Sequence, residues 1–161
     1  MQTKLKGDIS EAKALLEFQK RNIPVLIPWG DKERYDMVIE HNNHFYKVQV
    51  KTANEELNGA IKGYCRSSHD HTTHKNYYDY KNQVDYFVFY NINYDKIAIV
   101  PMSVIGDRKS ISLRLLPPKN NQKNVLYFDD FSFDKILCVE TLYEASQVDE
   151  EKVQTTKGKP M

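Results

Sequence analysis

The sequence predicts a mixed α/β (α+β) fold in which an N-terminal helix packs on a sheet. Three observations predict this fold. Residues 9–21 carry apolar side chains at helical spacing. Residues 34–51 contain two segments rich in β-branched and aromatic residues, on either side of a polar tetrad. Further alternating segments follow between residues 60 and 128, so that one helix precedes most of the strands.

The helix is expected over residues 9–21, because Asp8 is a suitable N-cap and Glu11 stands at the third helical position, as in a capping box. Glu11 also shares a side of this helix with Leu15 and Phe18, at i+4 and i+7. It therefore lies at the border of the expected buried face, where it either closes the capping box or has a functional role. The apolar stripe expected on this helix consists of Ile9, Ala12, Leu15 and Leu16.

Residues 34–51 are expected to form a β-hairpin, and a short apolar strand at residues 25–27 precedes it. The tetrad at residues 41–44 has Asn42 and Asn43 at its centre, which favours a hairpin turn. With a loop of two or of four residues, the numbers of directly opposed residues sum to 85, so the predicted register does not depend on the turn type.

This register gathers polar groups at one end of the hairpin. Asp36 lies opposite Gln49, and Lys51 lies two residues further along on the same face. The same alternation also fits an ordinary ribbon with cross-strand charge pairs on a solvated face. The opposite face is predicted to be core and carries Tyr35, Met37, Ile39, Tyr46, Val48 and Val50.

Several shorter elements are expected after the hairpin. Residues 54–59 read as a turn, residues 102–105 fit one helical turn at most, and residues 68–83 are irregular. The predicted strands are residues 60–67, 85–90, 96–101, 110–116 and 124–128, the last two with weaker alternation.

The length and composition are those of an ordinary soluble globular protein, with 161 residues, 40% hydrophobic and 28% charged. Residues 1–146 are interpreted as a single domain, and residues 147–161 as a charged, frayed tail without a periodic apolar face. The formal net charge of +1 does not indicate nucleic-acid binding, although a basic groove can be balanced by acidic residues elsewhere.

The expected location is a reducing, intracellular compartment, the cytoplasm. No apolar run approaches the roughly 18 residues that a membrane helix needs, and the first residues lack an apolar signal-peptide segment. Cys65 and Cys138 are far apart and lack a metal-type spacing, which favours free thiols. No membrane partner is expected.

Together, Glu11, Asp36 and the segment Gln49-Val50-Lys51 resemble the pattern of the PD-(D/E)XK nuclease superfamily, and especially of its branch of small group-I-intron homing endonucleases. The resemblance runs from residue 6 to residue 116. It includes the Arg-Tyr-Asp approach to Asp36, the Gln-Val-Lys-Thr-Ala end of the hairpin and an Asp-Tyr-Phe strand. It implies a restriction-endonuclease-like mixed sheet with the N-terminal helix packed on it.

The resemblance also implies roles for individual residues. Asp36 corresponds to the central metal-binding carboxylate, and Glu11 to the helical acid that holds metal directly or through water. Lys51 corresponds to the motif lysine, and the Val50 carbonyl to a further metal ligand. Gln49 departs from the commonest pattern, which has Asp or Glu here. Active members with Gln are known, so the departure leaves cleavage open while removing one negative charge from the site.

Phosphodiester hydrolysis needs groups of these kinds, because negative charge builds up on the non-bridging oxygens and on the leaving 3′ oxygen. Mg²⁺ takes one or two protein carboxylates and completes its coordination with water and substrate phosphate. Glu11 and Asp36 supply two carboxylates, and the Gln49 amide oxygen can coordinate without adding charge. Lys51 is suited to positioning water or stabilising the transition state. The expected cofactor is therefore Mg²⁺, with no organic cofactor.

Basic, aromatic and amide groups mix between residues 62 and 81, a composition suited to phosphate and base-edge contacts, and equally to a polar surface loop. Arg34 either contacts phosphate or pairs with Glu33 or Glu40. The histidines of this stretch match no common zinc spacing. The predicted DNA contacts are Arg34, Lys62, Arg66, His69, His74, Lys75, Tyr78 and Lys81.

The predicted function is a Mg²⁺-dependent, site-specific endonuclease of double-stranded DNA, in the role of a homing endonuclease. The alternatives are a Holliday-junction resolvase or restriction-type nuclease, a DNA-binding module with a degenerate nuclease site, and a structural α+β interaction domain. Cutting both strands with one site per chain requires two copies, so a homodimer or homotetramer is expected.

Overall fold

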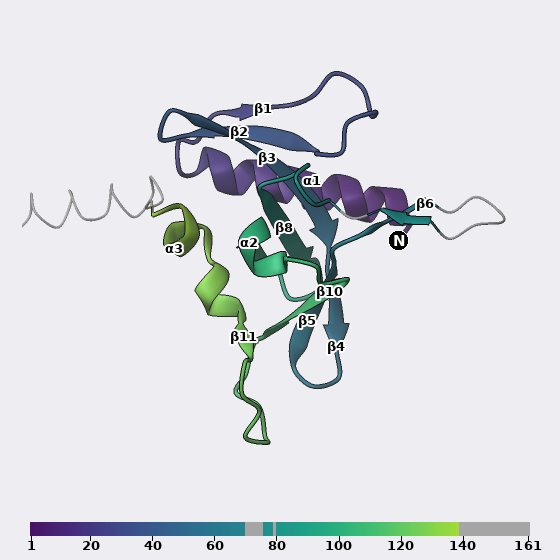
Figure 1. Cartoon of the computed structure of the whole chain (residues 1–161), viewed down its shortest axis with the longest axis vertical. Coiled ribbons are helices and arrows are strands. Elements are labelled where there is room, and N and C mark those ends of the chain that lie inside the picture. The colour runs from purple at the N-terminus through teal and green to yellow at the C-terminus, as the bar shows by residue number, and fades with distance from the viewer. Residues whose placement is uncertain (70–75, 79, 139–161) are drawn as a thin grey trace, which may run out of the picture.

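A five-stranded sheet lies between a long helix and a second, smaller sheet in the computed structural model, which describes residues 1–69, 76–78 and 80–138 (Figure 1). β3 and β8 are parallel, while the other neighbouring strands of this sheet are antiparallel, which confirms the predicted mixed sheet. In spatial order the strands are β1 (Val25–Leu26), β2 (Met37–His41), β3 (His44–Thr52), β8 (Tyr86–Asn91) and β9 (Lys96–Pro101).

The helix α1 (Thr3–Gln19) begins earlier than expected, so Asp8 is not its N-cap. Gln2 holds that position, and the predicted capping box involving Glu11 is therefore wrong. Gln2 forms no side-chain capping bond, and a hydrogen bond from the Thr52 hydroxyl to the Lys6 carbonyl joins the added turn to the end of β3. Without a capping role, the Glu11 side chain is available for another function.

The buried face of α1 also differs from the predicted stripe. Its buried residues are Ser10, Ala14, Glu17 and Phe18. Phe18 packs against the ring of Phe133, with 5.0 Å between the ring centroids, and this contact sets which side of the helix turns inward. Leu16 is therefore 48% exposed and Leu5 49% exposed. The apolar stripe of α1 faces outward.

The β2–β3 hairpin has the predicted register, with Met37 opposite Val48 and His41 opposite His44, pairs that each sum to 85. Asn42 and Asn43 both have positive φ, as a type I′ turn requires. The predicted core face is confirmed at its centre, where four side chains are buried against α1: Met37, Ile39, Val48 and Val50.

The second sheet covers the opposite face of the first and contributes the other hydrophobic core. Phe87 and Phe89 of β8 point into this core, while Val88 between them points toward α1. A Cβ at position 63 would overlap the ring of Phe89, so only glycine allows β5 to approach this closely. In spatial order the strands are β11 (Leu126–Tyr127), β10 (Ser110–Arg114), β5 (Ala60–Tyr64) and β4 (Asn54–Glu56).

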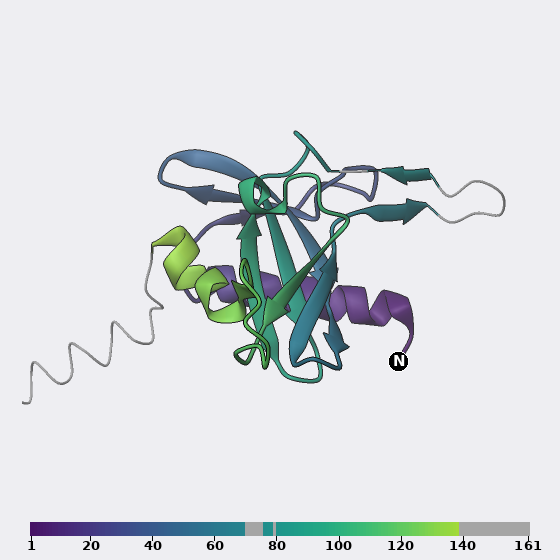
Figure 2. The same ribbon diagram turned by 60° about the horizontal axis from the view of Figure 1, so that its bottom comes forward.

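A two-stranded arm occupies part of the stretch expected to be irregular. It consists of β6 (Ser67–His69) and β7 (Asn76–Tyr78) and projects from the side of the molecule opposite α3 (Figures 1 and 2). The remaining elements are α2 (Met102–Ile105), which confirms the predicted single turn, η1 (Phe128–Phe131) and α3 (Phe133–Leu137).

Across the described ranges, no helix is long and apolar enough to span a membrane. Cys65 and Cys138 are free cysteines, as expected. The predicted tail at residues 147–161 lies outside the described residues, as do His74 and Lys75.

Candidate active site

Asp36 is held at the start of β2 by the strand beside it. Its backbone N–H donates to the Val48 carbonyl at 2.9 Å, which extends the hairpin pairing by one residue. Its Oδ2 accepts two hydrogen bonds of 2.6 Å, from the Gln49 side-chain amide and from the Val50 backbone N–H. The predicted opposition of Asp36 and Gln49 is thus a direct contact.

Only one oxygen of the Asp36 carboxylate is used in this way. Within the described part of the chain, Oδ1 receives no hydrogen bond, and no buried side-chain nitrogen or oxygen lacks a partner. Oδ1 is therefore open to solvent. Burial raises the pKa of Asp36, and the Val50 N–H, the charge of Lys51 and the Gln49 amide offset this only in part.

The Gln49 side chain is buried, and its amide nitrogen lies between two acceptors. Nε2 donates to Asp36 Oδ2 at 2.6 Å and to the Val50 carbonyl at 3.3 Å. A carboxylate and a carbonyl both accept hydrogen bonds, so the amide must present its NH₂ group to them. The NH₂ group thus brings partial positive charge to the two oxygen ligands predicted for a metal.

Glu11 reaches the same region from α1. The Ser10 hydroxyl bonds to the Thr52 hydroxyl at 2.8 Å and to the Lys6 carbonyl at 2.8 Å, which ties this turn of α1 to the end of β3. Burial, repulsion from Asp36 and repulsion from Asp8 raise the pKa of Glu11. The negative charges of Glu11 and Asp36 thus repel each other, and a cation bound near both would relieve this repulsion.

Lys51 extends from β3 on the same side as Gln49 and lies over an aromatic ring, with Nζ 5.3 Å from the centroid of Tyr80. Its charge lowers the pKa of Asp36, so the two groups interact electrostatically. Among the described residues, no carboxylate forms an ion pair with Lys51. Within the described ranges, its positive charge is therefore not neutralised by an ion pair.

The site holds fewer acidic ligands than a complete metal cluster would. In the part of the chain that the structure describes, no group of three or more His, Cys, Asp or Glu side chains could hold a metal ion. This agrees with Gln49 standing where the commonest pattern has a third acid. Asp36, Gln49 and Val50 are joined by hydrogen bonds, and Lys51 and Glu11 interact electrostatically with Asp36. The metal-binding and catalytic roles of these residues stay predictions.

The predicted DNA contacts are spread over several elements. Arg34 donates from Nε to Gln83 at 2.8 Å and from Nη1 to Ser67 at 2.9 Å. Lys62 lies on β5 of the second sheet, 3.8 Å from Glu56. His69 and Tyr78 belong to the β6–β7 arm.

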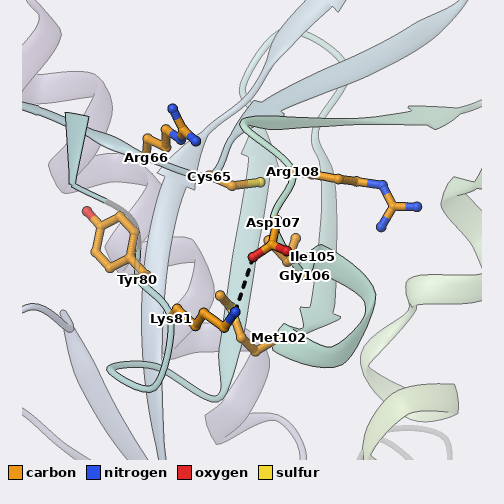
Figure 3. A pocket seen from close by; sticks show the side chains of 9 residues that line it. All are labelled: Cys65, Arg66, Tyr80, Lys81, Met102, Ile105, Gly106, Asp107 and Arg108. Atoms are coloured by element: carbon orange, nitrogen blue, oxygen red, sulfur yellow. Dashed lines mark hydrogen bonds and ion pairs between the residues drawn. The ribbon is translucent and has the colours of Figure 1, made fainter.

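Arg66 and Lys81 line a small pocket at the base of the arm (Figure 3). Lys81 pairs there with Asp107 at 3.3 Å. The buried Cys65 thiol also lines the pocket, and burial raises its pKa to about 11. Cys65 is therefore protonated at neutral pH and is not a nucleophile. Tyr80 lines the same pocket and connects it to Lys51.

Sequence reasoning did not single out Tyr80, Gln83 or Ser10 as site residues. Tyr80 and Gln83 fall in the stretch without periodic pattern, and their contacts to Arg34 and Lys51 join residues far apart in the chain. Ser10 is buried, although it lies outside the apolar stripe from which the sequence predicts the buried face of α1. The distance between these residues in the chain means that no local signal could have identified them.

Two comparisons with known proteins agree with this geometry. Residues 1–134 match the family model described as PD-(D/E)XK endonuclease. The fold is also similar to that of a solved structure, the bacterial homing endonuclease I-Ssp6803I, with a TM-score of 0.69 and 24% sequence identity. The alignment covers 99% of this chain and 100% of that one. No curated protein sequence matches the chain.

Proposed function

The chain belongs to the PD-(D/E)XK endonuclease family, and from this premise we propose that it is a Mg²⁺-dependent, site-specific endonuclease of double-stranded DNA. The observation that carries this proposal is the cluster of Asp36, Gln49 and Lys51 at the end of the hairpin, with Glu11 beside it. The solved structure of similar fold is described as a homing endonuclease. That description supports a homing role as the more specific proposal.

The donor set fits a hard divalent cation. Asp36 Oδ1, the Val50 carbonyl and the Glu11 carboxylate are oxygen ligands, which Mg²⁺ prefers, and waters and a DNA phosphate would complete its coordination. When bound, the cation stabilises the negative charge that builds up on the phosphate during hydrolysis. The raised pKa values of Asp36 and Glu11 mark a site where added positive charge is favourable.

Gln49 would contribute by turning its amide over. Its NH₂ group faces Asp36 and the Val50 carbonyl and would repel a cation held by them. A rotation of the amide by half a turn presents Oε1 instead, an uncharged oxygen ligand. Without a third negative charge, cation binding relies more strongly on the substrate phosphate. We therefore expect weak metal binding in the free protein.

Lys51 supplies the positive charge that the protein itself brings to the site. Its ammonium group donates hydrogen bonds to the attacking water or to a non-bridging phosphate oxygen, where charge increases as the P–O3′ bond breaks. Because no carboxylate pairs with Lys51 among the described residues, this charge is available to the substrate. Asp36 keeps the hydrogen bond from the Val50 backbone N–H, which the rotation of the Gln49 amide leaves in place.

The protein would act as a homodimer or homotetramer, since cutting both strands of a duplex needs two such sites. The outward stripe on α1 supports this, because Leu15 is 36% exposed, Leu16 is 48% exposed and Ala12 is exposed as well. A second copy of the chain would cover these side chains. Residues 1–146 would form the nuclease domain of each copy, acting on DNA inside the cell.

The test is cleavage of a supercoiled plasmid and of a random pool of duplexes, with Mg²⁺ or with EDTA. The wild-type protein is compared with Lys51→Ala, which removes the ammonium group while leaving the hairpin register intact. We expect discrete fragments from the wild type with Mg²⁺ only, and at least ~100-fold slower cleavage by Lys51→Ala. DNA binding by the variant should be largely unchanged.

Each other outcome selects a different function. Tight DNA binding without cleavage under any condition would indicate a degenerate nuclease site, with the neutral Gln49 as the cause to investigate. Cleavage of four-way junctions in preference to linear duplex would indicate a resolvase. Cleavage by Lys51→Ala at the wild-type rate would contradict the site assignment.

A further inference from the structure

Tyr80 lies directly behind the site, and its ring is 3% exposed. Two cations approach this ring. Lys51 Nζ lies 5.3 Å from the ring centroid and Arg34 Cζ lies 4.3 Å from it. The ring of Phe87 meets Tyr80 edge to face, with 5.3 Å between centroids and an interplanar angle of 89°. The ring of Phe87 thus packs against the Tyr80 ring, and the ammonium group of Lys51 lies over the Tyr80 ring.

A lysine side chain needs such support if it is to act at one position. It has four rotatable bonds and loses much conformational freedom when its ammonium group is held in place. No described carboxylate pairs with Lys51, so an ion pair does not fix it. The negative face of an aromatic ring attracts the ammonium without neutralising its charge. The Tyr80 ring can therefore orient Lys51 and still leave its charge for the phosphate.

Arg34 connects the same ring to the arm. Its guanidinium group lies over Tyr80 and donates hydrogen bonds to Ser67, the first residue of β6, and to Gln83. The base of the arm, the Tyr80 ring and Lys51 are therefore linked by direct contacts. A shift of the arm when it engages DNA would be transmitted to the ring through a rigid, planar group.

We propose that Tyr80 is a positioning residue, whose ring holds the Lys51 ammonium group at the scissile phosphate and, through Arg34, links this lysine to the β6–β7 arm. The inference rests on the proposed nuclease function. It assigns Tyr80 no contact with substrate. It also gives Arg34 a role in positioning rather than only in phosphate binding.

The test separates the electrostatic role of the ring from its role in packing. Tyr80→Phe keeps the ring face, whereas Tyr80→Leu keeps an apolar side chain without it. Phe18→Leu is the matched control, since Phe18 is equally buried, lies in the core on the α1 side of the sheet, and has no cation over its ring in the described structure. For each variant, the single-turnover cleavage rate, the Kd for the plasmid fragment that the wild type cuts, and the unfolding temperature are measured with protein in excess.

We expect Tyr80→Leu to cleave ~10-fold more slowly than wild type, with a Kd that changes less than ~3-fold. Tyr80→Phe should cleave near the wild-type rate. Phe18→Leu should unfold at a lower temperature, as Tyr80→Leu does, but cleave near the wild-type rate at a temperature where it is folded. Wild-type cleavage by Tyr80→Leu would overturn the inference while leaving the nuclease function in place.

A second measurement keeps the test valid if Tyr80→Leu fails to fold. Phenylalanines carrying one, two or three ring fluorines at position 80 weaken the negative face of the ring stepwise at nearly constant size. The cleavage rate should fall with each added fluorine, and a rate independent of fluorination would overturn the inference. Absence of cleavage by the wild type would instead overturn the proposed function, and this inference with it.

Discussion

Two glutamates on α1, Glu11 and Glu17, respond to partial burial in opposite ways. At Glu17, burial alone would raise the pKa, but hydrogen bonds from Arg21 and Lys20 outweigh it and the pKa is lowered. At Glu11, burial acts together with the negative charges of Asp36 and Asp8, and the pKa is raised. On one helix, the negative charge of Glu17 is thus balanced by basic side chains. The negative charge of Glu11, less than two turns away, is instead repelled by two other acids.

The difference lies in the partners that the fold provides. Arg21 donates to Glu17 at 2.9 Å and to Asp134 at 2.8 Å, and both acids hold this nearly buried guanidinium group in place. Asp36, by contrast, is held by two uncharged donors from β3. Carboxylates that stabilise the fold are neutralised within the chain, whereas those of the site leave positive charge to be supplied from outside.

The largest expected effect that would test this contrast is the loss of cleavage in Asp36→Asn. The amide has the same shape and can still accept hydrogen bonds from Gln49 and Val50, but it removes the negative charge. We expect the single-turnover cleavage rate to fall by ~100- to 1000-fold, with DNA affinity largely kept. A variant that cuts at the wild-type rate would place the essential carboxylate elsewhere.

The same isosteric change at Glu17 should have the opposite consequence. Glu17→Gln leaves the Arg21 guanidinium group with one acid instead of two, so the free energy of unfolding should fall by about 2 kcal/mol. Cleavage should persist at temperatures where the variant is folded. Urea unfolding followed by circular dichroism measures the loss, and unchanged stability would show that Asp134 alone neutralises Arg21.

The smallest effect is a difference in the pH dependence of stability. The lowered pKa of Glu17 adds stability above about pH 4.5, which is lost as the pH falls through its folded-state pKa. The raised pKa of Glu11 has the opposite sign, because ionisation above about pH 4.5 favours the unfolded chain.

Urea unfolding between pH 3 and pH 7 measures both effects. At pH 7, Glu17→Gln should be less stable than wild type and Glu11→Gln slightly more stable. Both differences should shrink toward pH 3, as the wild-type carboxyl groups take up protons. If the free energy of unfolding changed with pH in the same way in both variants, the two glutamates would not have opposite effects on stability.

The hairpin could be predicted from the sequence because its determinants are local. The alternation of residues 37–50 and the two asparagines at the turn fix the register, and the register alone brings Asp36 to Gln49. The resemblance to a nuclease family then supplied the roles of Glu11 and Lys51. The mixed sheet and the contact between Asp36 and Gln49 could therefore be predicted from the sequence, while the roles of Glu11 and Lys51 stay predictions.

The remaining features depend on contacts between distant parts of the chain. Leu15 and Leu16 fit the apolar pattern of a buried face, but the packing of Phe18 on Phe133 and the pairing of Arg21 with Asp134 turn α1 the other way. Tyr80 shows no periodic signal at all, and only the fold brings its ring beneath Lys51. Periodicity describes one element at a time and does not contain this information.

The parallel pairing of β3 with β8 has a consequence for the newly synthesised chain. The hairpin that carries Asp36 and Lys51 emerges from the ribosome well before β8, on which β3 depends for its second neighbour. A two-stranded hairpin is at best marginally stable in water. A half-made or truncated chain that ends before β8 therefore lacks the strand that completes the pairing of β3, on which Lys51 lies.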